Sequence, residues 1–194
     1  MNSKEQILRA IRSKLPPAAP LPDLPSFSAP HDDLFAHFNQ TLHSVGGSAI
    51  ELQAGESLSA CIAAHYPQAR VIASGLAEGL PGALDLHAIT DPHDLRNVDL
   101  ALLRGELAVA ENAAIWLGEA AMIHRALPFI TQHLVLVLRR ETLVWNLHQA
   151  YERIRIDRPG FGLFISGPSK TADIEQSLVI GAHGARSLGV VWEQ

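Results

Sequence analysis

Short runs of consecutive apolar residues alternate, from residue 32 onward, with segments whose apolar residues recur every three or four positions. The short runs predict buried strands, and the three-to-four spacing predicts helices. Alternation of this kind predicts an α/β fold with an open, mostly parallel sheet flanked by helices. The segments predicted as strands are SAIEL, ARVIAS, DLHAIT, the two apolar parts of VDLALLRGELAVAENAAIWL, QHLVLVLRR, FGLFIS and SLGVVWE.

Helices are predicted between these strands. One runs from a cap at Asp32 or Asp33 to about His43, and a second covers GESLSACIAAHY. The strongest helical pattern is ETLVWNLHQAYERIRI, in which one face carries Leu143, Val144, Leu147, Ala150, Tyr151 and Ile154. FGLFIS then leads into GPSKTADIEQSLVIG, which is predicted as a turn followed by a helix.

The N-terminal region differs from the rest. Residues 3–14 predict an amphipathic helix with a capping box at Ser3 and Gln6 and an apolar stripe of Ile7, Leu8, Ile11 and Leu15. The proline-rich residues 16–30 follow, and prolines favour extended structure. We therefore divide the chain into an N-terminal helix and proline-rich arm, residues 1–30, and an α/β domain, residues 31–194. The arm either docks on another subunit or a far face of its own domain, or is a partly disordered tail.

Composition narrows the class of protein. With 194 residues, of which 47% are hydrophobic, the chain is large enough to bury a core without disulfides or a structural metal. A net charge of −5 and the lack of a basic block argue against nucleic acid as a partner. No apolar stretch approaches the roughly 20 residues that span a bilayer, so no membrane insertion is expected. The N-terminus has no apolar signal segment, and we expect a cytoplasmic protein.

Cysteine and histidine usage argues against a metal site in this chain. Cys61 is the single cysteine, which excludes an internal disulfide and a zinc site with several thiolates. The ten histidines include no H-x-x-x-H or H-E-x-x-H pair. We find no G-x-G-x-x-G, Walker A or G-x-S-x-G motif either. We expect no metal and no cofactor in this chain.

The first candidate site is the run from Gly167 to Glu175, after a predicted strand. Its small and hydroxyl residues, among them Gly167, Pro168, Ser169 and Thr171, leave backbone N–H groups free to face a ligand. Asp173 argues against a simple phosphate cradle, because a carboxylate repels an anion. It would instead hold a ligand hydroxyl or orient a histidine. The alternative is ordinary helix capping by Ser169 or Thr171.

Two further groups of polar residues are candidates. His183 stands before Gly184 in a tight turn, where it acts as acid, base or metal ligand, or is only a surface residue. Glu106, Glu111 and Asn112 interrupt an apolar strand pair; they either face solvent or place a nucleophile or base in a cleft. Arg125 clamps a carboxylate or phosphate, or else forms a structural ion pair with Glu119 or Glu106.

GPSKTADIEQSLVIGAHG resembles the signature of the lactate-utilisation protein C family, the LUD domain. The stretch from Leu103 to Glu111, the segment RALPFITQHLVLVL and the N-terminal helix with its prolines are similar too. The resemblance has two departures. Asn112-Ala113-Ala114 replaces a threonine-glycine-threonine run, which bears on substrate identity, and Ala185 replaces a proline, which bears only on a turn.

The resemblance implies a NagB/RpiA/CoA-transferase-like fold and a role in oxidising L-lactate to pyruvate beside iron–sulfur partner proteins. One cysteine cannot hold a [4Fe–4S] cluster, so such clusters would lie in the partners. Glu111, Asp173 and His183 would be catalytic. The residues that would bind a small carboxylate or phosphorylated ligand are Glu106, Asn112, Arg125, Gly167, Pro168, Ser169, Thr171 and Gly184.

Two other functions remain open. The chain could be a stand-alone enzyme of the CoA-transferase or isomerase type, with Glu111 or Glu106 as nucleophile or base. It could also be a non-catalytic assembly subunit that docks through residues 1–30. The sequence leaves open whether the chain itself is catalytic and whether it forms a homo-oligomer.

Overall fold

The structure is a computed structural model of the whole chain. It describes all residues except 1, 18, 24, 31, 77–79, 157–159, 172–178 and 194. Within the described part, no helix is both long enough and apolar enough to cross a membrane.

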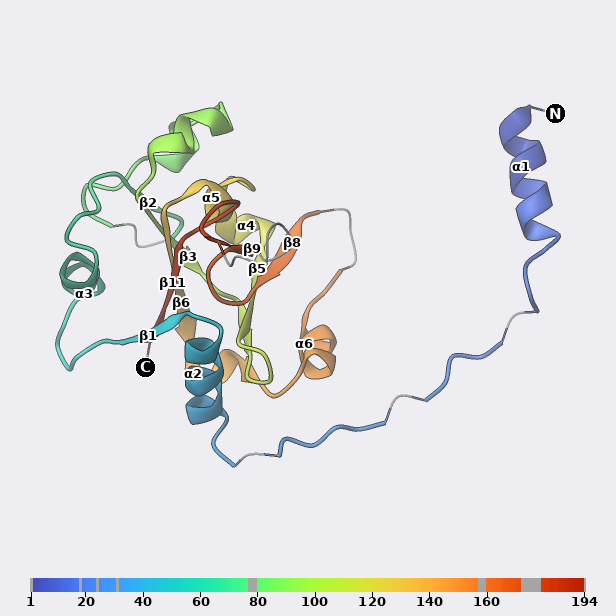
Figure 1. Ribbon diagram of the computed structural model, residues 1–194, viewed down its shortest axis with the longest axis horizontal. Coiled ribbons are helices and arrows are strands. Elements are labelled where there is room, and N and C mark those ends of the chain that lie inside the picture. Colours follow the sequence, from blue (N-terminus) through green and yellow to red (C-terminus); the bar gives the residue numbers. More distant parts are fainter. Residues whose placement is uncertain are drawn as a thin grey trace.

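The centre of the domain is a five-stranded sheet in which every neighbouring pair is parallel (Figure 1). In spatial order its strands are β1 (Ser48–Glu51), β11 (Ser187–Glu193), β6 (His133–Arg139), β3 (Leu100–Arg104) and β2 (Ile72–Ser74). The inner strands β6 and β3 are continuous apolar runs because both faces of the sheet are covered. The predicted open, mostly parallel α/β sheet is confirmed.

Alternate residues of the central sheet supply two separate cores. One face packs against α3 (Leu58–His65), and its buried residues include Leu100, Leu102, Val135, Val137 and Val191. The other face packs against a second sheet and α2, and its buried residues include Ala101, Leu103, Leu134, Leu136, Leu138 and Val190. The two sets differ by one position because successive side chains of a strand point to opposite faces.

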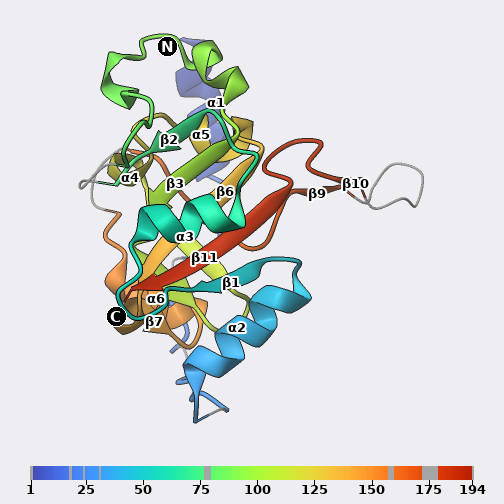
Figure 2. The same cartoon turned by 90° about the vertical axis from the view of Figure 1, so that its left-hand side faces the viewer.

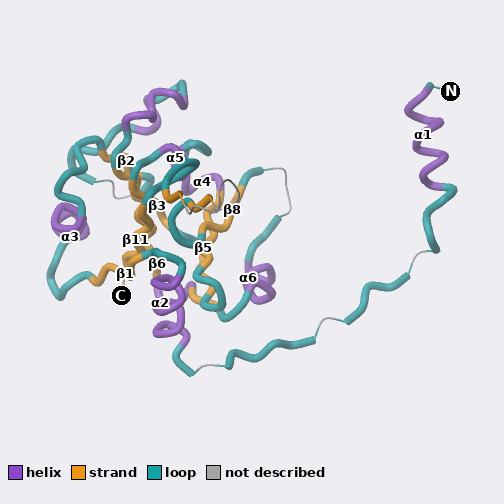
Figure 3. The backbone as a smooth tube through the Cα atoms, in the orientation of Figure 1, coloured by secondary structure: helices purple, strands orange, loops and turns teal. Residues whose placement is uncertain are grey.

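The second sheet has the spatial order β7 (Leu143–Val144), β4 (Leu107–Val109), β5 (Ala114–Gly118) and β8 (Gly162–Ile165). β4 pairs with β7 in parallel, whereas the β4–β5 and β5–β8 pairs are antiparallel. α6 (Leu147–Arg153) covers its outer face, where Ala150 is fully buried. Figure 3 shows the resulting order of α3, central sheet, second sheet and α6.

The remaining helices close the edges of the domain. α2 (Leu34–Ser44) begins at Asp33, whose carboxylate accepts the Ala36 N–H at 2.9 Å, and it buries Phe38 and Leu42. α4 (Glu119–Met122) and α5 (Leu127–Ile130) are single turns. Three short 3-10 helices are η1 (Leu86–Ala88), η2 (Pro92–Asn97) and η3 (Arg140–Thr142).

Two predicted elements are wrong. The long helix over ETLVWNLHQAYERIRI is instead β7 followed by the shorter α6, because Leu143 pairs with Ala108 and Val144 with Val109. Asn146 then caps α6 by accepting the Gln149 N–H at 3.0 Å, so the helix begins only at residue 147. DLHAIT forms η1 rather than a strand.

The predicted N-terminal helix is confirmed as α1 (Ser3–Arg12), and it stands apart from the domain in Figure 1. Its capping box uses Asn2 and Glu5 rather than Ser3 and Gln6. None of its residues is buried, and its apolar stripe faces solvent. The arm touches the domain at Phe27, whose ring stacks on His148 with centroids 5.2 Å apart. The division at residue 30 stays a prediction.

A small hairpin extends from the domain beyond the start of β11 (Figure 2). It consists of β9 (Lys170–Thr171) and β10 (Val179–Ile180), which pair antiparallel. The flanks of the helix predicted after Ser169 are therefore strands. The rest of that predicted helix, Asp173 included, lies outside the described residues.

Candidate functional site

The two chain segments that flank hairpin β9–β10 meet beside the start of β11. The Ser169 N–H donates to the Ala185 carbonyl at 2.8 Å, and the Gly181 N–H donates to the Ser169 carbonyl at 3.0 Å. We call residues 166–171 and 181–186 the Ser169 cluster. Two of the candidate segments, the one around Ser169 and the one around His183, are thus brought together.

The cluster lies at the amino end of the central sheet. The Arg186 N–H donates to the carbonyl of Gln132, the residue before β6, at 3.0 Å. Ligands in open parallel sheets usually bind at the carboxyl ends of the strands. The cluster lies at the amino end instead because β8, the strand that leads into it, belongs to the second sheet and runs antiparallel to β5.

Glycine is required where the cluster contacts the rest of the domain. Gly167 has φ +73°, and a Cβ there would come within 2.4 Å of the Val45 carbonyl oxygen at the end of α2. Gly181 has φ +79°, and a Cβ would lie 2.5 Å from the Arg186 Cβ. Both positions exclude larger residues through conformation and through space. Ala185 supplies a carbonyl that a proline would also supply, so that departure leaves this bond possible.

The β4–β5 turn reaches the same cluster. The Ser166 hydroxyl donates to the Asn112 carbonyl at 2.7 Å, and the Asn112 side chain accepts the Ala114 N–H at 3.1 Å. Glu111 is exposed, and its N–H donates to the Trp145 carbonyl at 2.8 Å. Ala113 has φ +53°, a conformation that favours the glycine of the threonine-glycine-threonine run.

The other residues of the cluster differ in exposure. Pro168 is buried, and it lies 3.5 Å from the position that a Cβ on Gly46 would take. Thr171 donates its hydroxyl to the Val179 carbonyl across the hairpin at 3.4 Å. His183 is exposed, and Gly184 faces Ser169, since a Cβ on Gly184 would lie 3.1 Å from the Ser169 Cβ.

Glu106 and Arg125 lie outside the Ser169 cluster. The Glu106 carboxylate covers Gly118, where a Cβ would lie 2.5 Å from Oε1. Arg125 Nε donates to Glu119 Oε1 at 2.7 Å, which holds the pKa of that carboxyl below its usual value. Gly118 is the end of β5 farther from the β4–β5 turn, about 13 Å from Ala114 at roughly 3.3 Å per residue. Of the two roles predicted for Arg125, the structure contains the ion pair with Glu119.

A series of hydrogen-bonded polar side chains beside the cluster was not predicted from the sequence. Arg186 Nη2 lies 3.3 Å from His133 Nε2, and His133 Nδ1 lies 2.6 Å from Ser187 Oγ. An arginine only donates, so Nε2 accepts and the proton sits on Nδ1, which donates to Ser187. Ser187 also bonds to the Tyr66 hydroxyl, whose pKa burial raises. In this tautomer, Nδ1 cannot take the proton of Ser187, so the pair is not a nucleophile with its base.

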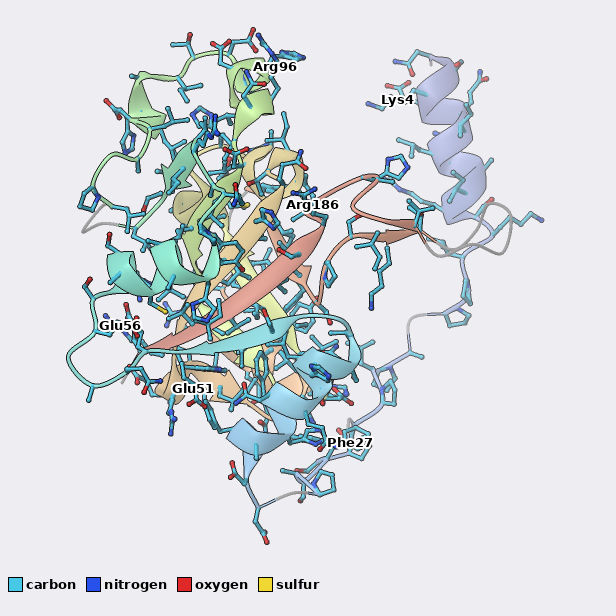
Figure 4. All side chains as sticks on the ribbon, turned by 60° about the vertical axis from the view of Figure 1, so that its left-hand side comes forward. Lys4, Phe27, Glu51, Glu56, Arg96 and Arg186 are labelled. Atoms are coloured by element: carbon cyan, nitrogen blue, oxygen red, sulfur yellow. The ribbon has the colours of Figure 1, made fainter. Side chains whose placement is uncertain are left out.

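Within the described residues, these side chains do not offset the charge of Arg186. Burial lowers the pKa of His133, and the Arg186 charge lowers it further, so the imidazole is neutral near pH 7. Among the described residues, no carboxylate forms an ion pair with Arg186. Figure 4 labels Arg186 at the start of β11. The one feature of the sequence that could have indicated Arg186 as a site residue is its position shortly after His183-Gly184.

The described residues contain no group of three His, Cys, Asp or Glu side chains arranged to hold a metal ion. Cys61 lies on α3 and is fully buried. Its pKa is raised first by burial and then by the charge of Glu56. The single thiol of this chain is thus a core residue.

Comparison with known proteins gives several relatives that share one name. "Lactate utilization protein C" of Shouchella clausii is 33% identical over 92 residues, which is 44% of this chain and 40% of that protein. The protein of the same name from Oceanobacillus iheyensis is 28% identical over 92 residues, again 44% of this chain and 40% of that protein. The chain thus matches about two-fifths of the length of these relatives.

A solved structure shares the fold. A DUF162 family protein from Deinococcus radiodurans superposes with a TM-score of 0.62 at 22% identity, over 82% of this chain and 95% of that one. The family model of the LUD domain matches residues 92–191, more than half of the chain, from η2 to the end of the central sheet. The match includes the Ser169 cluster and the β4–β5 turn, and the chain belongs to the LUD domain family.

Proposed function

We propose that this chain serves lactate utilisation and binds a small carboxylate, such as lactate or pyruvate, at the Ser169 cluster. The names of its relatives support the role. The observation that carries the site is Arg186, an exposed cation held by a neutral histidine beside two loops rich in small residues.

Arg186 is the anchor in this proposal. A guanidinium binds a carboxylate through two parallel hydrogen bonds, and it needs no carboxylate partner of its own chain for that. His133 orients Nη2 from behind, which leaves the other donors of the guanidinium for the ligand. Lys170 and His183, both exposed in the cluster, would add positive charge or a hydrogen bond.

The remaining candidates would act on the hydroxyl side of lactate. Asp173 and His183 would contact the ligand hydroxyl or move its proton. Ser169 would supply a donor, and Thr171, whose hydroxyl proton goes to the Val179 carbonyl, would supply a hydroxyl oxygen. Glu111 would face them from the β4–β5 turn. A negative Glu111 near the ligand favours a monoanion over a phosphorylated dianion, because like charges repel. Among the two ligand classes predicted from sequence, we therefore propose the carboxylate.

Electron transfer would belong to other proteins. The only thiol of this chain is buried, so a four-thiolate iron–sulfur cluster would need partner proteins to carry it. We propose that the arm, residues 1–30, docks on such a partner in the cytoplasm. The exposed stripe of α1 supports this role because an amphipathic helix normally buries its apolar face.

Titration of the chain with L-lactate and pyruvate by calorimetry tests the site. Arg186→Gln should weaken binding by roughly 10- to 100-fold, the value of a charge-assisted hydrogen bond. Arg96→Gln is the matched control, since Arg96 is an exposed arginine on η2, labelled far from Arg186 in Figure 4. Equal binding by both variants would reject the site.

A growth assay tests the role separately. Asp173→Ala and His183→Ala should abolish growth on lactate while circular dichroism shows an intact fold. Arg125→Gln should leave growth unchanged, because Arg125 pairs with Glu119 away from the cluster. Normal growth of the Asp173 and His183 variants would reject the proposed contacts.

A further inference from the structure

A cavity of about 360 Å³ opens at the carboxyl end of β2. Because all strands of the central sheet are parallel, this is the opposite end of the sheet from the Ser169 cluster. Three segments line it: residues 74–76, residues 84–87, and α4 with the residue that follows it. In Figure 2, α4 lies on the side of the domain away from hairpin β9–β10. Carboxyl ends of parallel strands are where ligands bind in open α/β sheets.

The walls of the cavity are tied to one another. Leu84 extends the sheet edge, since its N–H donates to the Ile72 carbonyl at 2.8 Å. His124 Nε2 donates to the Leu86 carbonyl at 2.8 Å and so fixes this second wall to the segment after α4. Gly75 approaches α4 so closely that a Cβ would lie 2.8 Å from the Ala121 carbonyl. The cavity is therefore preformed.

A strained residue forms part of the third wall. Ile123 has φ +60° and ψ −53°, and the His124 N–H donates to the Met122 carbonyl at 2.6 Å. This is a classic γ-turn, which is rare and strained, and a β-branched residue at its centre adds to the cost. The strain places the Ile123 side chain in the cavity and aims His124 at Leu86. Strain of about 1–3 kcal/mol persists at sites that the surrounding structure holds in place.

The lining has an apolar side and an acceptor side. Leu84, Leu86 and Ile123 supply apolar surface, while Asp85 supplies a carboxylate, of which one oxygen already accepts the His87 N–H at 3.0 Å. Ser74 adds a hydroxyl whose oxygen accepts the Leu76 N–H at 3.3 Å, which leaves its own proton free to donate. Among the described residues that line the cavity there is no lysine or arginine.

We propose that this cavity binds a nucleoside. The free oxygen of Asp85 accepts hydrogen bonds from the neighbouring hydroxyls of the ribose, as a carboxylate does at the carboxyl end of dinucleotide-binding strands. The base lies against Leu84, Leu86 and Ile123. A phosphate is disfavoured because it would meet the Asp85 carboxylate, and no lysine or arginine among the described lining residues offsets the repulsion. The volume falls within the roughly 300–1,000 Å³ of small-molecule sites.

Calorimetric titration of the full chain with adenosine, guanosine, uridine and cytidine tests the proposal. At least one nucleoside should bind, its 2′,3′-dideoxy form should bind at least 10-fold more weakly, and its 5′-monophosphate should not bind more tightly. Asp85→Asn should weaken nucleoside binding by a similar factor. The variant keeps the helix cap, because asparagine caps a helix as well as aspartate does. Asp91→Asn is the matched control: Asp91 also accepts the N–H of a histidine two residues later but does not line the cavity.

Three results would overturn the proposal. They are no binding of any of the nucleosides at millimolar concentration, tighter binding of a monophosphate than of its nucleoside, and equal binding by the Asp85→Asn and Asp91→Asn chains. Arg186→Gln should leave nucleoside binding unchanged, because Arg186 lies at the other end of the sheet. A loss in that variant would also contradict two separate sites.

Discussion

Replacement of Gly167 by alanine should destabilise the domain more than the same change at a glycine of equal backbone conformation. Gly167 has φ +73°, which costs an alanine about 1–2 kcal/mol. Its Cβ would also lie 2.4 Å from the Val45 carbonyl oxygen, so the end of α2 must move. Overpacking of this kind costs about 1–3 kcal/mol more. The alanine also lowers the conformational entropy of the unfolded chain, which offsets about 0.4–1 kcal/mol of this destabilisation.

Gly55→Ala is the control, since Gly55 has φ +78° and nothing within 4 Å of a Cβ. It carries the conformational cost without the contact. The difference between the two variants should be about 1–3 kcal/mol, or roughly 2–12 °C in melting temperature for a domain of this size. Urea unfolding followed by tryptophan fluorescence measures it. Equal losses would show that contact between Gly167 and α2 does not hold the Ser169 cluster in place.

Three other results are expected. The pKa of His133 is lowered by burial and then by Arg186, so its contribution to stability is complete above about pH 6.5 and is lost as the pH falls below that value. His133→Asn should therefore show a smaller fall in urea midpoint than wild type between pH 7.5 and 5.5; equal falls would contradict this. Ala113→Val should destabilise by about 1–3 kcal/mol because Ala113 has φ +53°, whereas Ala113→Gly should stay within about 1 kcal/mol of wild type. Removal of residues 1–30 should leave the melting temperature within about 2 °C, since α1 buries nothing; a larger drop would show that the arm belongs to the domain.

The strands were predictable where both faces of the sheet are buried, because QHLVLVLRR allows no helical reading with a polar side. The segment around Leu143 and Val144 was not, since its apolar residues fit a helix and a strand equally well. Pairing with Ala108 and Val109, distant in the sequence, decides between them. Local periodicity contains no information about such a partner.

The same limit applied to the candidate site. The signature placed Ser169 and His183 together because glycine and hydroxyl residues follow a strand and precede a turn. The pair of His133 and Arg186 depends on the register of β6 against β11, in which His133 lies opposite Ser187. Arg125 was assigned to the ligand, but its partner Glu119 is only six residues away, as its structural alternative predicted.

The position of β11 has a consequence for biosynthesis. β1 is hydrogen-bonded to β11 and to no other strand among the described residues, and Ser48 lies 140 positions before Leu188. At about 5–20 residues per second, β1 leaves the ribosome roughly 7–28 s before its partner has been translated. Phe38 of α2 precedes Trp192, with which its ring is in contact at 5.1 Å between centroids, by 154 positions and so waits slightly longer. The nascent domain therefore carries uncovered apolar surface on α2 and β1 through most of its translation.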